Sequence, residues 1–408
     1  MLIYLEDEII EVFKEGSNTS KQLNYFENIL YSHVLGKHFV FASRKGIDFL
    51  KGFQKLSETM RGYMTVLDSK YATIFNFLNN LKVRINVILG NNIFRKININ
   101  DSVNFEISLD YFEDPRSLES IKVISENIED SFFYKECINY FPLPYPIELF
   151  DVEIEETEGN GNGIGNNILR KNERKNMLLI ITDSDKKYPE AEIGATAKEA
   201  TEAYESIKKN SISKLVVLDV HEKENMIPYS FYKICNSNSR TLEKLKEIEE
   251  YGFKDFQSYF DFKQGINTDN FNQYHERIIE KVPIIGMEKK GGIELFNGSL
   301  DEFIDYRDQR INNKKEFPIR YILEPINTTK IFNKFSFEEM RKYVSKNIES
   351  CESNKIIPEY VVEEWRDLEM KLENPASHLN DNQRECIMNI VTSITQWGIS
   401  RASSATGS

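Results

Sequence analysis

The run Met177-Leu178-Leu179-Ile180-Ile181-Thr182, followed at once by Asp183-Ser184-Asp185, decides the fold of this 408-residue chain. Its apolar part predicts a strand buried on both faces, as in a parallel sheet covered by helices. Such sheets bind ligands at the carboxyl ends of their strands. Because Asp-x-Asp is frequent by chance, the pair gains meaning only from the strand ends around it.

Two other predicted strands also end in carboxylates. The run Ile121–Ser125 leads into Glu126, and the apolar run Lys214–Val220 leads into Glu222 and Glu224. Each has an ordinary explanation alone, since acids in a first turn stabilise a helix and the later acids could belong to a solvated turn. Because parallel strands end at one edge of their sheet, we expect the three acidic ends to meet and to hold a hard cation such as Mg²⁺ or Mn²⁺.

Three segments carry a resemblance to a known family. Ser125–Tyr134, Ile180–Asp185 and Glu222–Pro228 resemble motifs of TOPRIM nucleases of the overcoming-lysogenization-defect (OLD) type. In the first motif a Glu closes a strand and an acid follows four residues later; the second is Asp-x-Asp. The resemblance covers residues 117–230. It departs from the family at Asn127, where Gly is usual, although Asn tolerates left-handed backbone geometry.

The resemblance implies a magnesium- or manganese-dependent endonuclease that hydrolyses phosphodiester bonds of DNA or RNA with one or two ions. It implies these metal ligands: Glu126, Asp183 and Asp185 for one ion, Asp130 and Glu224 for a second, and Glu222 as the substitute for Glu224. An anti-phage defence role is implied by the resemblance alone. Since no ATPase segment accompanies the motifs, a regulatory or ATPase protein would act in trans.

Three lysines are candidates for contact with phosphate. Lys263 could stabilise the charge of a scissile phosphate as a catalytic residue, although packing of its stem on Phe260 is the more ordinary expectation. Lys186 and Lys187 directly follow the Asp pair and are expected to touch substrate or to be solvated. The segment Gly159–Gly165 lacks the ending of a phosphate-binding loop and predicts a flexible surface turn that could line a substrate groove.

Two other functions stay open. Other TOPRIM chemistry, either primase-like nucleotidyl transfer or topoisomerase action, would use the same carboxylates. A regulatory or binding protein with a degenerate acidic site would keep the fold without catalysis. His221, beside the later acids, could be a ligand or a proton carrier, with a structural role the more ordinary expectation.

The composition is that of an ordinary globular protein with 40% hydrophobic and 29% charged residues. A formal net charge of −13 argues against broad non-specific nucleic-acid binding, but a nuclease can still bind phosphate through a local basic groove and bound metal. No apolar stretch is long enough for a membrane span, and the first residues lack a signal-peptide pattern. The four cysteines are widely spaced, so we expect free thiols and a cytoplasmic protein. Association into a homo-oligomer is a separate expectation.

The chain divides into three predicted parts and a tail. Residues 1–116 predict a mixed α/β region, 117–230 a TOPRIM-like α/β domain with a mainly parallel sheet flanked by helices, and 231–400 a mainly helical region. Residues 401–408 are small and polar and are expected to be disordered. The outer regions would provide substrate grip, oligomerisation or control.

Local periodicity predicts the individual elements. Helices are expected over Met64–Leu81, Asp130–Tyr140, Ile168–Lys175, Ala195–Lys209, Ser239–Glu250, Phe337–Asn347, Tyr360–Leu372 and Gln383–Thr395. Strands are expected over His38–Ala42, Val83–Leu89, Ile121–Ser125, Pro146–Ile154, Met177–Thr182 and Lys214–Val220. Ser336 and Glu339 predict a capping box at the start of one helix.

Overall fold

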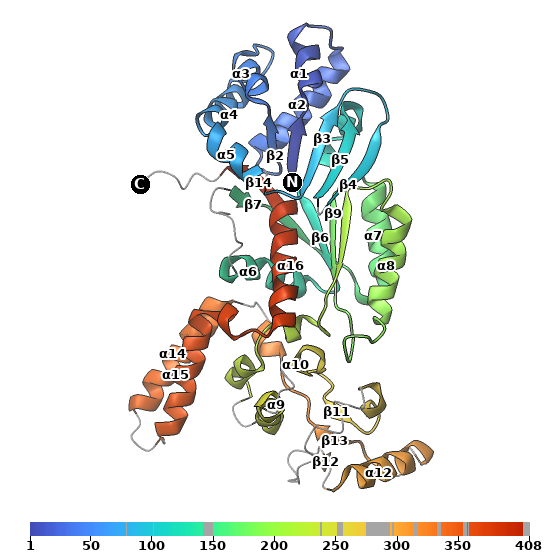
Figure 1. Ribbon diagram of the computed structural model, residues 1–408, viewed down its shortest axis with the longest axis vertical. Helices are drawn as coiled ribbons and strands as arrows, with labels where there is room; N and C mark the ends of the chain where they lie inside the picture. Colours follow the sequence, from blue (N-terminus) through green and yellow to red (C-terminus); the bar gives the residue numbers. More distant parts are fainter. Residues whose placement is uncertain are drawn as a thin grey trace.

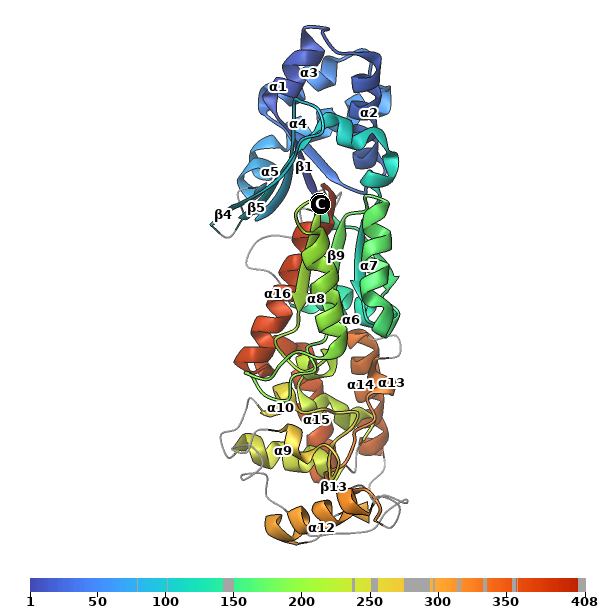
Figure 2. The ribbon, with the colours of Figure 1, turned by 90° about the vertical axis from the view of Figure 1, so that its right-hand side faces the viewer.

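The computed structural model describes residues 1–408 except 79, 101, 142–149, 237–238, 251–255, 275–293, 296–297, 314–316, 333–335, 354–356, 358 and 403–408. The molecule is elongated, with three parts stacked along its long axis (Figures 1 and 2). An N-terminal sheet with its helices lies at one end, a four-stranded sheet lies in the middle, and the C-terminal region forms the other end.

The N-terminal part is built on a five-stranded sheet. Its strands lie in the order β2 (Phe39–Ala42), β1 (Leu2–Leu5), β3 (Val83–Ile88), β5 (Ser102–Ser108) and β4 (Phe94–Ile99). The first four are parallel and β4 is antiparallel to β5. The helices of this part are α1 (Asp7–Lys14), α2 (Ser20–Val34), α3 (Arg44–Gly52), α4 (Glu58–Ser69) and α5 (Tyr71–Leu78), followed by the 3₁₀ helices η1 (Leu109–Glu113) and η2 (Pro115–Leu118).

The single helix predicted over Met64–Leu81 is wrong, because α4 and α5 are separate. Lys70 leaves the helical backbone region with φ −104° and ψ 9°. This break lets the Tyr71 ring stack on Phe41 of β2, with centroids 5.1 Å apart. Packing against the sheet therefore overrides a helical periodicity that continues through the break.

The middle part contains the predicted parallel sheet flanked by helices. Its strands lie in the order β10 (Ser213–Val217), β9 (Leu178–Thr182), β6 (Ile121–Ser125) and β8 (Ile154–Glu158), all parallel. The chain runs from β6 to β8 on one side and then returns to β9 on the other. The strand order thus reverses between β6 and β9, which is where open α/β sheets bind ligands.

Helices cover both faces of this sheet, which explains the continuous apolar run of β9. Helices α7 (Ile164–Glu173) and α8 (Ala195–Ile207) cover one face, while α6 (Ile128–Tyr140) and α16 (Asp381–Gly398) cover the other (Figure 1). Leu178 and Ile180 join the apolar cluster under α7 and α8. Leu179 and Ile181 point to the opposite core. The predicted helix Ile168–Lys175 is the second half of a longer α7.

Two predicted strands differ from the observed ones by more than one residue at an end. The strand predicted to reach Val220 ends at Val217 in β10, and its last residues turn toward the loop that follows. The strand predicted over Pro146–Ile154 is split between β7 (Phe150–Val152) and the start of β8. The early part of that prediction, within 142–149, lies outside the described residues.

The C-terminal region is mainly helical but also contains strands. Its helices are α9 (Arg240–Glu250), α10 (Phe256–Tyr259), α12 (Leu300–Asn312), α13 (Thr329–Phe332), α14 (Phe337–Ser353) and α15 (Glu359–Glu373), with β11 (Ile266–Asn267), β13 (Arg320–Leu323) and β12 (Glu294–Leu295) forming a small sheet. Short 3₁₀ helices occur in the middle part at η4 (Gly161–Gly163) and η5 (Lys223–Met226). Others follow at η6 (Tyr229–Ile234), η7 (Phe271–Gln273) and η8 (Pro375–His378). The Glu339 N–H donates to Ser336 Oγ at 3.3 Å, which forms half of the predicted capping box. Helices α14 and α15 form a hairpin that projects from the molecule (Figure 1).

The last helix returns to the middle of the molecule. After α16, strand β14 (Ile399–Ala402) pairs antiparallel with β7. The buried Trp397 ring meets Phe105 of β5 edge-on, with centroids 6.2 Å apart. The last two residues of β14, 401 and 402, belong to the tail that the sequence predicts to be disordered, and 403–408 lie outside the described residues. Helix α16 therefore joins the middle sheet to the N-terminal sheet.

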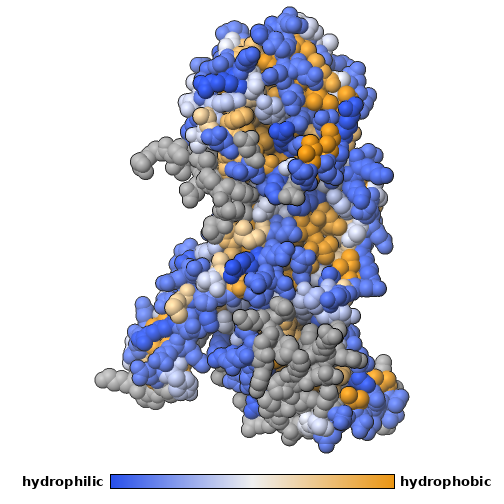
Figure 3. Space-filling model, in the orientation of Figure 1, coloured by the Kyte–Doolittle hydropathy of each residue, from blue (hydrophilic) through white to orange (hydrophobic). Residues whose placement is uncertain are grey.

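Among the described residues, none of the helices combines the length and apolar character needed to cross a bilayer. The face shown in Figure 3 is mainly hydrophilic, with apolar residues gathered between α16 and α8.

Candidate functional site

The three acidic strand ends meet at the carboxyl edge of the middle sheet. Strands β6 and β9 are neighbours, so Glu126 and Asp183 leave adjacent strands at the point where the order reverses. The N–H groups of Ser184 and Asp185 donate to the carbonyl of His221 at 3.1 and 2.9 Å. These bonds join the loop after β9 to the loop after β10. The structure therefore places the carboxylates that the sequence singles out along one edge, although, among the described residues, the ligand atoms of Glu126, Asp183 and Asp185 do not all lie within 4.8 Å of one another.

The glycine-rich loop holds the end of β6. The Gly159 N–H donates to the carbonyl of Ser125 at 2.7 Å, and the Gly161 N–H donates to that of Glu126 at 3.4 Å. A Cβ at position 159 would lie 2.4 Å from the Ser125 oxygen, so only glycine permits this approach. The loop expected to be a flexible surface turn instead fixes the backbone of a candidate metal ligand.

Asp130 lies under this edge and is already paired. Its carboxylate accepts the Asn127 N–H at 2.9 Å and forms an ion pair with Lys223, and all but 1% of its surface is buried. Asn127 adopts an extended backbone at φ −124°, so its tolerance of left-handed geometry is not used. Lys223, between two acids in sequence, supplies a counterion that the sequence does not point to.

Asp183 occupies the centre of the cluster. Its Oδ1 accepts the Lys223 backbone N–H at 3.1 Å. Burial, and then the negative charges of Asp130, Glu222 and Glu224, raise the pKa of Asp183 well above its usual value. Burial, followed by the charges of Asp185 and Asp130, likewise raises the pKa of Glu126. Carboxylates that repel one another in this way are stabilised by a bound cation.

Glu222 and Glu224 lie buried on the loop after β10 and face Lys263. Lys263 forms ion pairs with Glu222 and, at 3.1 Å, with Glu224 Oε1. Burial and the charge of Glu222 raise the pKa of Glu224 to about 7. Although burial opposes it, the charges of Glu224 and Glu222 hold the pKa of Lys263 above its usual value. Lys263 thus reaches the acidic edge.

One carboxylate oxygen of Glu224 is left without a partner among the described residues. Glu224 Oε2 is buried and accepts no hydrogen bond from the residues that the structure describes. An unpartnered buried carboxylate oxygen is costly unless another ligand satisfies it. Its place among other carboxylates is suited to a cation.

Asp185 lies at the rim, exposed and in a strained backbone conformation. Its φ of +56° is in the left-handed region that side-chain-bearing residues rarely adopt. A Cβ at Gly194, which precedes α8, would lie 2.0 Å from Asp185 Oδ2. The absence of a side chain at Gly194 therefore makes room for the Asp185 carboxylate. Strain of this kind concentrates at functional sites.

A second group adjoins the cluster and includes Asp261, which the sequence does not single out. Single ligand atoms of His221, Glu222 and Asp261 lie within 4.8 Å of one another. Lys187 Nζ lies 2.8 Å from Asp261 Oδ2 and 3.5 Å from His221 Nε2. Against the effect of burial, hydrogen bonding by His221 and the charge of Lys187 hold the pKa of Asp261 well below its usual value. This group carries its own positive charge.

A cavity of about 440 Å³ opens beside these residues. Its lining combines carboxylates with lysines: Asp185, Lys187, His221, Glu222, Asp261, Lys263, Gln264 and Gln273. The other candidate lysine, Lys186, donates from Nζ to the Pro189 carbonyl at 3.2 Å and is not among the lining residues. Space for a ligand therefore lies next to both the acids and two of the three candidate lysines.

Buried amides hold the acidic loop in place. Asn225 Nδ2 donates to the carbonyls of Gln257 and Phe260 at 2.6 and 2.8 Å. Gln383 Nε2, from α16, donates to the carbonyls of Asn225 and Ile227 at 2.8 and 3.1 Å. Both amide side chains belong to residues that are fully buried. The position of the loop thus depends on segments far away in sequence.

The residues at this edge fit a hard divalent cation. Six carboxylates line it, Glu126, Asp130, Asp183, Asp185, Glu222 and Glu224, and Lys223 and Lys263 pair with three of them. Among the described residues, the acids and histidine whose ligand atoms already lie within 4.8 Å of one another are His221, Glu222 and Asp261. Oxygen ligands and excess negative charge are what Mg²⁺ and Mn²⁺ require. No family model, curated protein or solved structure matches the chain, so the assignment of this site rests on its residues and geometry.

Proposed function

We propose that the chain is a metal-dependent TOPRIM nuclease that hydrolyses phosphodiester bonds in nucleic acid. The observation that carries the proposal is the position of Asp183, surrounded by Asp130, Glu222 and Glu224 where the strand order reverses. A bound divalent ion would polarise the phosphodiester and make a water molecule a better nucleophile at neutral pH. The sequence resemblance to OLD-type nucleases points to the same chemistry.

The residues divide into those that would hold the ion and those that would meet substrate. Glu126, Asp183 and Asp185 would hold one ion, and the unpartnered oxygen of Glu224 is available to it or to a second. Lys263 lies at the cavity beside them, where its ammonium group would counter the charge of a phosphate. Anti-phage defence in the cytoplasm and control by an ATPase supplied in trans are parts of the proposal that rest on the resemblance alone.

The test is cleavage by the purified chain. With Mg²⁺ or Mn²⁺, we expect it to shorten plasmid DNA or RNA, and we expect the double variant Asp183→Asn, Asp185→Asn to be at least about 100-fold slower because the ion loses two ligands. The matched control is Asp301→Asn, Asp305→Asn, which makes the same charge change on the exposed face of α12. Equal cleavage by the two double variants would refute the site assignment.

A second candidate is a binding or regulatory protein, and the ion pairs favour it. Lys223 forms an ion pair with Asp130, and Lys263 forms ion pairs with Glu222 and Glu224. At a degenerate site these lysines could take the place of metal ions. Calorimetric titration with Mn²⁺ separates the two, since absence of binding at millimolar concentration supports the binding protein. Incubation with labelled nucleoside triphosphates and a template tests nucleotidyl transfer, because a nuclease only shortens its substrate.

A further inference from the structure

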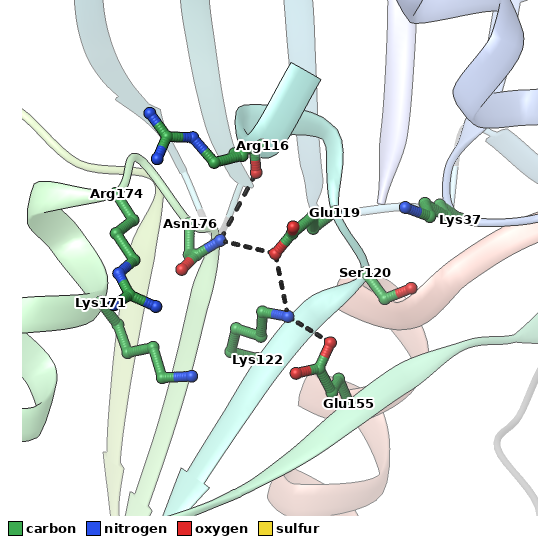
Figure 4. A pocket seen from close by; sticks show the side chains of 9 residues that line it. All are labelled: Lys37, Arg116, Glu119, Ser120, Lys122, Glu155, Lys171, Arg174 and Asn176. Atoms are coloured by element: carbon green, nitrogen blue, oxygen red, sulfur yellow. Dashed lines mark hydrogen bonds and ion pairs between the residues drawn. The ribbon is translucent and has the colours of Figure 1, made fainter. Parts of the chain in front are cut away.

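A second pocket lies at the opposite edge of the middle sheet, near the amino ends of its strands. It has a volume of about 480 Å³ and is shown in Figure 4. Its lining is entirely polar or charged: Lys37, Arg116, Glu119, Ser120, Lys122, Glu155, Lys171, Arg174 and Asn176. Five of these residues are cationic and two are acidic, so the lining carries a formal charge of +3 in a chain whose net charge is −13.

The cations come from three parts of the fold. Lys37 lies between α2 and β2 of the N-terminal part, and Arg116 lies in η2, which connects that part to the middle sheet. Lys122 is on β6, and Lys171 and Arg174 lie at the carboxyl end of α7. Cations at a helix end stabilise its dipole, which accounts for the two on α7. It does not account for Lys37, which reaches the pocket from a different part of the chain.

Two of the five cations are neutralised within the structure. The buried Lys122 pairs with Glu155 and, at 3.1 Å, with Glu119. Arg116 pairs with Asp114 at 2.7 Å. These pairs fix one wall of the pocket, and Asn176 Nδ2 adds a hydrogen bond to Glu119 Oε2 at 3.2 Å (Figure 4).

The other three cations form no close ion pair among the described residues, although the charge of Lys37 acts on Glu119 and that of Glu155 on Lys171. The side chains of Lys37, Lys171 and Arg174 form no ion pair with any residue that the structure describes. Burial and the charge of Lys122 outweigh the opposing charge of Glu155 and lower the pKa of Lys171, so the net surroundings of its ammonium group disfavour a positive charge. An anion in the pocket would reverse that effect. Three unpaired cations around a preformed cavity are the features of an anion site.

We propose that this pocket binds a compact anion that carries several phosphate groups. Three unpaired cations match a multiply charged ligand better than a single acetate-like group. Among the residues that the structure describes, the lining offers no aromatic or aliphatic side chain on which a nucleobase could stack, so the phosphate chain itself would be recognised. Such a chain occurs in inorganic tripolyphosphate and in nucleoside triphosphates. A ligand held by Lys37 and by Lys171 with Arg174 would join the N-terminal part to the middle sheet.

The proposal is independent of nuclease activity, and its test uses binding alone. The full-length chain is titrated calorimetrically with tripolyphosphate and, separately, with a nucleoside triphosphate, in EDTA and at fixed ionic strength. EDTA removes divalent ions, so the acidic edge repels both probes. We expect binding to the wild type and an at least tenfold weaker affinity for Lys171→Ala, Arg174→Ala. The matched control is Lys45→Ala, Lys55→Ala, which removes two exposed lysines of the N-terminal part and should keep the affinity.

Each outcome decides the proposal. Equal affinities for the two probes support recognition of the phosphate chain, and tighter binding of the nucleoside triphosphate supports a nucleotide as its source. Equal losses in the pocket and control variants would overturn the site, as would affinity for orthophosphate equal to that for tripolyphosphate. Displacement of tripolyphosphate by a short DNA duplex of higher affinity would assign the pocket to nucleic acid instead. Lys37→Glu provides a second variant from a separate element and should weaken binding as well.

Discussion

At the scale of single residues, the fold holds like-charged carboxylates close together at the acidic edge, which is formed by Glu126, Asp130, Asp183, Asp185, Glu222 and Glu224. Like charges at close range oppose ionisation, and burial strengthens that effect. The pKa of Asp183 and that of Glu224 are both raised, while Asp261 nearby is held ionised by His221 and Lys187. Neighbouring groups whose pKa values are moved in opposite directions are typical of functional sites.

A side chain added at position 194 would disturb this edge without changing its charge. We expect Gly194→Ala to displace the Asp185 carboxylate, because a Cβ there would lie 2.0 Å from Oδ2. The affinity for Mn²⁺ measured by calorimetry should fall about tenfold, which corresponds to about 1.4 kcal/mol. Gly62→Ala is the control, since a Cβ there meets nothing within 4 Å. Unchanged Mn²⁺ affinity in Gly194→Ala would show that Asp185 is not a ligand.

We expect Lys263 to weaken metal binding and to speed cleavage of the substrate. In Lys263→Met the ion pairs with Glu222 and Glu224 are lost, so the acidic edge attracts Mn²⁺ more strongly and the dissociation constant should fall several-fold. Cleavage should nevertheless slow by about 10- to 100-fold, because a cation at the phosphate is missing. Weaker Mn²⁺ binding together with normal cleavage is the result that this account does not allow.

The sequence points to residues at strand ends and misses residues that reach the site by folding. Glu126 and Asp183 directly follow predicted strands and Glu224 comes four residues after the end of one, so their type and position could be recognised. Asp261 comes to the edge on a turn in which its own Oδ1 accepts the backbone N–H groups of Lys263 and Gln264. A short Asp-x-Lys-Gln turn has no distinctive pattern, and the pairing of Lys223 with Asp130 spans 93 residues.

At the scale of elements, periodicity predicts the middle sheet well because its strands are buried on both faces. Strand β6 matches its predicted bounds, and β9 begins one residue later than predicted. The failures have one physical cause, which is tertiary contact. The predicted helix is broken where Tyr71 stacks on β2, and β10 ends early where its loop bonds to Ser184 and Asp185.

Helix α16 supports the acidic loop through one amide, and this gives an element-scale prediction. Gln383→Leu removes both hydrogen bonds to the loop, leaving the Asn225 and Ile227 carbonyls without these donors. The free energy of unfolding, measured with urea, should fall by about 1–3 kcal/mol for each acceptor left unsatisfied. The exposed neighbour Glu385→Ala is the control and should change it by less than about 0.5 kcal/mol. A stable Gln383→Leu protein with normal Mn²⁺ affinity would show that the loop needs no such support.

At the scale of the whole molecule, the N-terminal and middle sheets share one plan. The chain adds a second parallel strand on one side of the first and then returns to the other side, giving β2–β1–β3 and β8–β6–β9. The sequence predicts a mainly parallel middle sheet without its strand order, and in the N-terminal part it predicts β2 and β3 but not β1, which has only four residues and leaves little periodic signal. The pocket lined by Lys37, Lys171 and Arg174 lies where these two parts meet.

Two buried histidines in the N-terminal part predict how the stability of the whole chain responds to acid. Burial lowers the pKa of His33 to about 4 and that of His38 well below its usual value. Below pH 6.5 the unfolded chain binds protons that the folded chain does not, so stability is lost as pH falls toward 4. Each histidine contributes a slope of up to about 1.4 kcal/mol per pH unit. Urea unfolding between pH 4 and 7 should show a shallower slope in His33→Gln, and an unchanged slope would contradict the assignment.

The position of Gln383 also sets an order of events during synthesis. Chains fold from the N-terminus as they leave the ribosome, so both sheets can form while the last helix is still being made. The loop that carries Glu222 and Glu224 gains its support from α16 only when residue 383 has emerged. A nascent chain therefore carries an unfinished acidic edge, and the nuclease activity that we propose would arise only in completed molecules.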